Sequence, residues 1–120
     1  MKKILIVDDE PNIVMSLEYT FKKNNYQVFI ARDGQEALDI VKTNFPDVII
    51  LDIMMPGMDG YEATKRIRNT KSLSEIPIIA VTAKAMKGDR ETSLSNGLNE
   101  HITKPIEGAA LINLLNNFFQ

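Results

Sequence analysis

The feature that most constrains this chain is a run of four aliphatic residues, 48–51, that ends on the carboxylate of Asp52. A continuous aliphatic run of this length predicts a strand that is buried on both faces of a sheet. Pro-Gly and Asp-Gly pairs follow within residues 56–60 and predict a loop. In an open parallel sheet, ligands bind beyond the carboxyl ends of the strands. Asp52 is therefore a candidate functional residue, provided that the sheet is parallel.

Strand and helix patterns alternate along the rest of the chain. Strands are predicted at residues 4–7, 27–31, 48–51, 78–81 and 100–103. Helices are predicted from residue 11 to about 24, from 34 to about 45, after 60, from about 85 to 95 and from about 107 to 119. This alternation indicates an α/β fold of the flavodoxin-like, doubly wound type, with a five-stranded parallel sheet in the order 2-1-3-4-5 and five helices. The strands 27–31 and 100–103 are short or mixed in composition, so we expect them at the sheet edges.

The chain of 120 residues has the size and composition of one globular domain, and we expect residues 1–120 to form a single domain. It has no cysteine, which excludes disulfides, thiol catalysis and cysteine-ligated zinc. A net charge of -2 gives no reason to expect direct nucleic-acid binding. The apolar runs are too short for a signal peptide or a membrane span, so we expect a cytoplasmic protein without membrane contact.

Side chains able to carry chemistry follow four of the predicted strands. They are Asp8 and Asp9, Asp52, Thr82 and Lys104. In the predicted strand order these strand ends share one edge of the sheet. Clustered carboxylates repel one another, and a divalent hard cation such as magnesium relieves that repulsion. A carboxylate beside such an ion can act as a nucleophile toward phosphorus, while a lysine and a hydroxyl stabilise the phosphoryl oxygens.

Each of these residues also has an ordinary structural explanation. Asp8 or Asp9 is suited to cap a helix that begins at Pro11, and Asp52 is suited to a turn at a strand end. Most lysines are solvated at the protein surface, which is the ordinary explanation of Lys104. The joint placement of all these residues at strand ends favours a functional site.

Four motifs together resemble the response-regulator receiver domain of two-component signal transduction, the chemotaxis-regulator-like family. They are ILIVDDE at residues 4–10, DIMMPGMDG at 52–60, VTA at 81–83 and KP at 104–105. The resemblance covers essentially the whole chain, and the second motif is the most specific. It implies a phosphorylation-activated switch in which Asp52 accepts a phosphoryl group from a histidine kinase or a histidine phosphotransfer protein.

The resemblance also implies a magnesium site. Asp9, Asp52 and the backbone carbonyl of Met54 would bind Mg²⁺ directly, and Asp8 would act through a bound water. Magnesium is the one cofactor expected.

The remaining matched residues would bind the phosphoryl group and report its presence. Lys104 and the backbone N–H of Ala83 would contact the phosphoryl oxygens, and Thr82 would turn toward them. Pro105 would follow a cis peptide bond, which X-Pro bonds adopt at little cost.

The implied output face consists of the helix 85–95, the strand 100–103 and the helix 107–119. Its partner would be a downstream effector protein or an attached output domain. His101 stands on this face where receivers usually carry tyrosine or phenylalanine. The favoured explanation is a partly exposed edge-strand residue. The alternative is a switch residue that responds to pH, because histidine titrates near neutrality.

Met54 and Lys84 occupy the positions that tune hydrolysis of the phosphoryl group in this family. The side chain of Met54 offers no group to orient a water molecule, which predicts slow self-dephosphorylation.

Three classes of function remain. A phosphorylation-controlled switch is favoured, and we expect no turnover of external substrates. A turnover phosphatase with an aspartyl nucleophile typically carries D-x-D after the first strand, whereas residues 8–10 read Asp-Asp-Glu. A degenerate receiver that only mediates contacts would lack an acid or the lysine, and none is missing.

Overall fold

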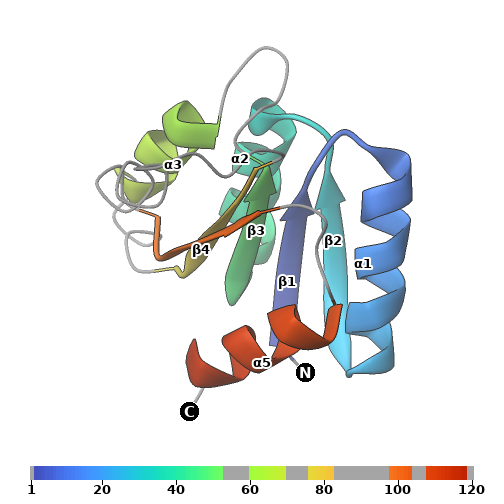
Figure 1. Ribbon diagram of the computed structural model, residues 1–120. Helices are drawn as coiled ribbons and strands as arrows, with labels where there is room; N and C mark the ends of the chain where they lie inside the picture. Colours follow the sequence, from blue (N-terminus) through green and yellow to red (C-terminus); the bar gives the residue numbers. More distant parts are fainter. Residues whose placement is uncertain (1, 53–59, 70–75, 83–97, 104–107, 119–120) are drawn as a thin grey trace.

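The structure is a computed structural model that describes residues 2–52, 60–69, 76–82, 98–103 and 108–118. Its sheet contains five parallel strands. The strands are β1 (Lys2–Val7), β2 (Tyr26–Ala31), β3 (Val48–Asp52), β4 (Ile78–Thr82) and β5 (Glu100–Thr103). Their order is β2-β1-β3-β4-β5, and every neighbouring pair is parallel. The predicted strand order is confirmed, with β2 and β5 at the edges (Figure 1).

Four described helices cover the two faces of this sheet (Figure 1). They are α1 (Pro11–Lys23), α2 (Gly34–Asn44), α3 (Gly60–Arg68) and α5 (Gly108–Phe118). Helices α1 and α5 pack on one face, and α2 and α3 pack on the other. The doubly wound architecture is confirmed, while the predicted helix 85–95 lies outside the described residues.

Two apolar clusters, one on each face, explain why the central strands are continuous aliphatic runs. Alternate residues of β1 and β3 point to opposite faces, and both faces are buried. The cluster under α1 and α5 contains Ile4, Ile6, Leu17, Phe21, Tyr26, Val48, Ile50, Ile79, Val81, Leu111 and Leu115. The cluster under α2 and α3 contains Leu5, Val7, Ala31, Ala37, Leu38, Val41, Ile49, Leu51, Ile67, Ile78, Ala80 and Leu98.

The element boundaries differ from the predicted ones by one residue at several ends, and β1 begins two residues earlier than predicted, at Lys2. Strand β2 begins at Tyr26 rather than at residue 27, because Tyr26 pairs with Lys2 and packs edge-on against Phe21. The centroids of these two rings are 5.2 Å apart. Helix α1 ends at Lys23, and α2 ends at Asn44, before a left-handed residue at position 45.

A polar clamp ties α3 to the start of β4, at the end opposite Thr82. Arg68 donates to the carbonyl of Ile76 at 2.6 Å and to Oδ1 of Asn99 at 2.7 Å. The N–H of Ile78 donates to the same Oδ1 at 2.8 Å, and the N–H of Asn99 donates to the carbonyl of Ile78. The clamp therefore fixes where β4 begins relative to the chain that enters β5.

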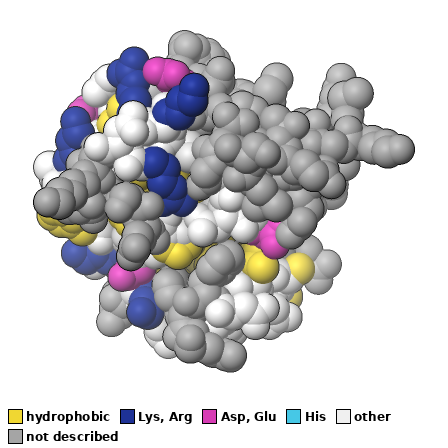
Figure 2. Space-filling model, turned by 90° about the vertical axis from the view of Figure 1, so that its left-hand side faces the viewer, with side chains coloured by type: hydrophobic (Ala, Val, Ile, Leu, Met, Phe, Trp, Pro, Cys, Tyr) yellow, Lys and Arg dark blue, Asp and Glu magenta, His cyan; other side chains and the backbone are white. Residues whose placement is uncertain are grey.

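The last turn of α3 also carries the basic residues Lys65 and Arg66 besides Arg68. Figure 2, which views the molecule from its α3 side, shows Lys and Arg side chains gathered on the upper part of that surface. Arg66 pairs with Glu62 at 3.2 Å across one helical turn. Half-exposed pairs of this kind contribute little to stability, so the charges mainly keep this side of α3 solvated.

Candidate functional site

The register of the sheet brings two carboxylates together. Val7 pairs with Leu51, so the next residues, Asp8 and Asp52, lie side by side at the carboxyl ends of β1 and β3. Only 3% of Asp8 and 4% of Asp52 is exposed to solvent. Adjacent buried carboxylates repel one another and favour the binding of a cation between them.

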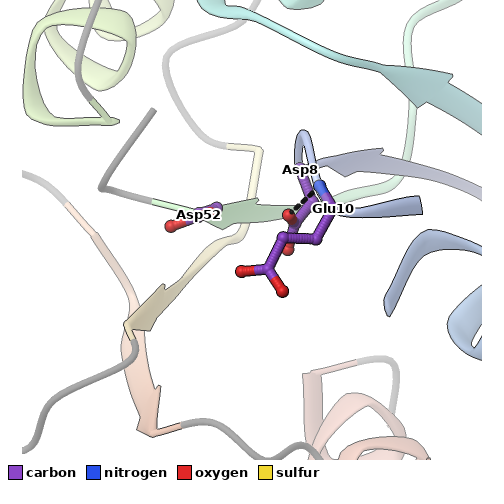
Figure 3. A group of neighbouring side chains, drawn as sticks. All are labelled: Asp8, Glu10 and Asp52. Carbon is purple, nitrogen blue, oxygen red and sulfur yellow. Dashed lines mark hydrogen bonds between the residues drawn. The ribbon is translucent and has the colours of Figure 1, made fainter. Parts of the chain in front are cut away.

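The local chain fold orients the Asp8 carboxylate. Its Oδ1 accepts a hydrogen bond from the backbone N–H of Glu10 at 2.9 Å (Figure 3). The Asp8 N–H donates to the carbonyl of Ala31 at 3.1 Å, which anchors the residue to the end of β2. The N-cap position of α1 is Glu10, so neither Asp8 nor Asp9 occupies it, and helix capping does not account for these two acids.

Three carboxylates form a cluster at this edge of the sheet. One oxygen each of Asp8, Glu10 and Asp52 lies within 4.8 Å of the others. Asp9, for which the receiver resemblance implies direct metal binding, is exposed and is not a member of this cluster. Glu10 was missed as a site residue, although it is the third acid of the run at residues 8–10.

Two further predicted residues, Thr82 and His101, lie on described strands. Asp52 pairs with Val81, so Thr82 follows at the end of the adjacent strand β4, where it is 6% exposed. His101 is half-buried in β5 beside Ala80. The other predicted site residues lie outside the described residues, namely Met54, Ala83, Lys84, Lys104 and Pro105.

The chemistry of the donor set suits a hard divalent cation. All three clustered side chains offer carboxylate oxygens, which are preferred by Mg²⁺ and Ca²⁺ over nitrogen or sulfur. Magnesium is commonly bound by one or two protein carboxylates together with phosphate oxygens. The cluster at Asp8, Glu10 and Asp52 therefore fits a site for a hard divalent cation such as Mg²⁺.

Comparison with known proteins identifies the class. The family model described as the response regulator receiver domain matches residues 4–116. The chain therefore belongs to the response-regulator receiver family, whose members act as signalling switches of two-component systems. Receiver domains are phosphorylated on an aspartate and bind Mg²⁺ in an acidic pocket.

Individual relatives agree with this assignment. The chain is 43% identical over 104 residues to the alkaline phosphatase synthesis transcriptional regulatory protein PhoP of Bacillus subtilis (strain 168). The match covers 87% of this chain and 42% of PhoP, so the chain spans less than half of that relative.

Solved structures show the same fold. The chemotaxis protein CheY4 of Vibrio cholerae superposes with a TM-score of 0.91 at 31% identity, over 98% of each chain. The receiver domain of the sensor histidine kinase PA1611 from Pseudomonas aeruginosa PAO1 gives a TM-score of 0.88 at 35% identity, over 97% of this chain and 95% of that one. That structure holds a magnesium ion coordinated in its active-site cleft.

Among the residues that the structure describes, every helix is too short or too polar to cross a bilayer.

Proposed function

We propose that Asp52 is the residue of this receiver domain that accepts the phosphoryl group. The observation that carries the proposal is the position of its buried carboxylate, at the carboxyl end of a central parallel strand beside Asp8 and Glu10. Ligands bind at this edge in open parallel sheets. The donor is a phosphohistidine of a histidine kinase or of a histidine phosphotransfer protein.

In the proposed reaction, a carboxylate oxygen of Asp52 forms a bond to phosphorus while the phosphorus–nitrogen bond of the donor breaks. As the receiver resemblance implies, Asp9, Asp52 and the backbone carbonyl of Met54 would hold Mg²⁺ directly, and Asp8 would act through a bound water. The ion, when bound, would neutralise charge on the phosphoryl oxygens. Asp8 enters the reaction already oriented by the N–H of Glu10.

The proposed response to phosphorylation involves residues beyond the carboxylates. Lys104 and the N–H of Ala83 bind the phosphoryl oxygens, and Thr82, at the end of β4, turns toward them. This movement relays the signal to the face formed by the helix 85–95, the strand β5 and the helix α5. Pro105 follows a cis peptide bond in this proposal.

The output is a downstream effector or an attached domain. PhoP is a transcriptional regulatory protein, and the absence of direct nucleic-acid contact here stays a prediction. We further propose a cytoplasmic location, a single domain over residues 1–120 and no turnover of external substrates.

The test is an intact-mass measurement after incubation with acetyl phosphate and Mg²⁺. We expect one phosphate adduct on the wild type, none on Asp52→Asn, and an unchanged adduct on Asp39→Asn. Asp39 is an exposed acid on α2, so its substitution controls for the loss of one charge. Absence of the adduct from the wild type would favour a degenerate contact module, and repeated turnover of small phosphoesters would favour a phosphatase.

The lifetime of the phosphoryl group is proposed to be long, because the side chain of Met54 offers no group that orients water. Lys84 is the second tuning residue, and its effect on hydrolysis is open in either direction. Decay of the phosphorylated form should be faster in Met54→Asn. An unchanged decay rate would show that Met54 is not what slows hydrolysis.

A pH-dependent switch at His101 is the less favoured of its two explanations. Its test compares the pH profile of partner binding in wild type and in His101→Tyr. Identical profiles would leave His101 as an ordinary edge-strand residue.

A further inference from the structure

We propose that Glu10 is a third anionic residue of the divalent-cation site and sets how tightly the unphosphorylated protein holds Mg²⁺. The inference rests on the proposed function, since it assumes a cation beside Asp8 and Asp52. It adds a residue to which the receiver resemblance assigns no role. It also concerns the resting protein rather than the phosphorylation step.

The first support is the position of the side chain. A carboxylate oxygen of Glu10 lies within 4.8 Å of oxygens of both Asp8 and Asp52. In Figure 3 the Glu10 side chain folds back from the start of α1 alongside Asp8, and its carboxylate lies on the side that faces Asp52. Opposite ligands of one Mg²⁺ ion lie about 4.2 Å apart, twice a bond length of about 2.1 Å. The separation of the three oxygens is at most 4.8 Å, a limit slightly above this distance, so Glu10 lies at or near bonding distance of an ion held beside Asp8 and Asp52.

The second support is that this carboxylate does not cap the helix at whose start it stands. Glu10 is the N-cap of α1, yet its side chain makes no capping hydrogen bond. At the equivalent position of α2, Asp33 accepts the N–H of Glu36 at 2.8 Å. Pro11 at the first helical position lacks an N–H, which leaves α1 one donor fewer to satisfy. The Glu10 carboxylate lies instead near the carboxylates of Asp8 and Asp52, where a bound cation would attract it.

The third support is independent of this cluster. A magnesium ion is coordinated in the active-site cleft of the PA1611 receiver domain, which shares this fold. An ion in that cleft of this chain would stand beside three carboxylates. Because Glu10 is exposed, solvent screens its attraction to the ion, and its loss should weaken binding on the order of tenfold.

The experiment measures Mg²⁺ affinity of the unphosphorylated full chain by calorimetric titration, in wild type, Glu10→Gln and Glu36→Gln. Glu36 is a matched control, because it is an exposed acid in the first turn of α2 and follows β2 at the same edge of the sheet. We expect the dissociation constant to rise on the order of tenfold in Glu10→Gln and to stay unchanged in Glu36→Gln. Equal affinities in these two variants would overturn the proposal.

A second measurement separates this proposal from the proposed function. The same proteins are incubated with acetyl phosphate at saturating Mg²⁺, and the phosphate adduct is measured by mass. An adduct that depends on Asp52, combined with unchanged cation affinity in Glu10→Gln, would overturn the role of Glu10 and leave the phosphoryl acceptor intact. Weakened cation binding in Glu10→Gln, without any adduct on the wild type, would support the role of Glu10 in cation binding. It would overturn the proposed function of Asp52 as phosphoryl acceptor.

Discussion

The backbone N–H of Glu10 donates a hydrogen bond of 2.9 Å to Oδ1 of Asp8. The bond holds a carboxylate that is only 3% exposed at the end of β1, next to a second buried carboxylate at Asp52. A charged acceptor strengthens such a bond, which offsets part of the cost of burying the charge. The acidic site is thus oriented by its own backbone before a ligand binds.

This bond leads to a prediction about stability without metal. Asp8→Asn keeps the acceptor oxygen and removes one of the adjacent charges, whereas Asp8→Ala loses the acceptor. In urea titrations with a chelator present, we expect the free energy of unfolding of Asp8→Asn to exceed that of Asp8→Ala by about 1 kcal/mol or more. The order of the two variants is the test, and a reversed order would show that the acceptor oxygen at position 8 does not stabilise the fold.

The clamp at the start of β4 predicts a contrast between two substitutions of Asn99. Asn99→Ala removes the acceptor shared by Arg68 and the N–H of Ile78, so we expect a loss of about 1–3 kcal/mol in the free energy of unfolding. Asn99→Asp keeps an acceptor and places a charge against Arg68, so its loss should be clearly smaller. Chemical denaturation measures both variants, and equal losses would contradict this account of the clamp.

A close contact between α1 and α5 predicts a compensating pair of substitutions. A Cβ added at Gly108 would lie 2.9 Å from Cγ2 and 3.0 Å from Oγ1 of Thr20. Gly108→Ala should therefore lower stability by about 1–3 kcal/mol, as overpacking does. In a double-mutant cycle, Thr20→Ala should restore most of that loss because it removes both atoms. Additive losses in the thermal unfolding of the double variant would show that the two residues do not clash.

The burial of Tyr26 predicts a change at alkaline pH. Burial raises the pKa of Tyr26 above its ordinary value of 10.0, because it disfavours the charged phenolate. The folded state then binds more protons than the unfolded state above about pH 10, so the free energy of unfolding falls as pH rises through that range. The variant Tyr26→Phe keeps the packing against Phe21 and should show a shallower fall. The measurement is urea unfolding at a series of pH values, and parallel curves would refute the prediction.

The alternation of residue patterns was enough to predict the architecture. Runs such as residues 48–51 are aliphatic throughout because both faces of a central parallel strand are buried, and this signal is local in sequence. The strand order follows from general rules for right-handed crossovers, and it placed Asp8, Asp52 and Thr82 at one edge. The start of β2 at Tyr26 was less predictable, because it depends on packing against Phe21.

The sequence by itself determined the fold class, the family and the strand ends where the acids lie. The spacing of apolar residues and the order of the motifs carry this information, and both are properties of the chain alone. Tertiary structure decided which acids meet. Asp9 and Glu10 are adjacent and both exposed, yet the cluster contains Glu10 and not Asp9. Beyond the end of β1 the pleat no longer sets side-chain direction. The turn closed by the bond from Glu10 to Asp8 sets it instead, and the register of β1 against β3 brings Asp52 into reach.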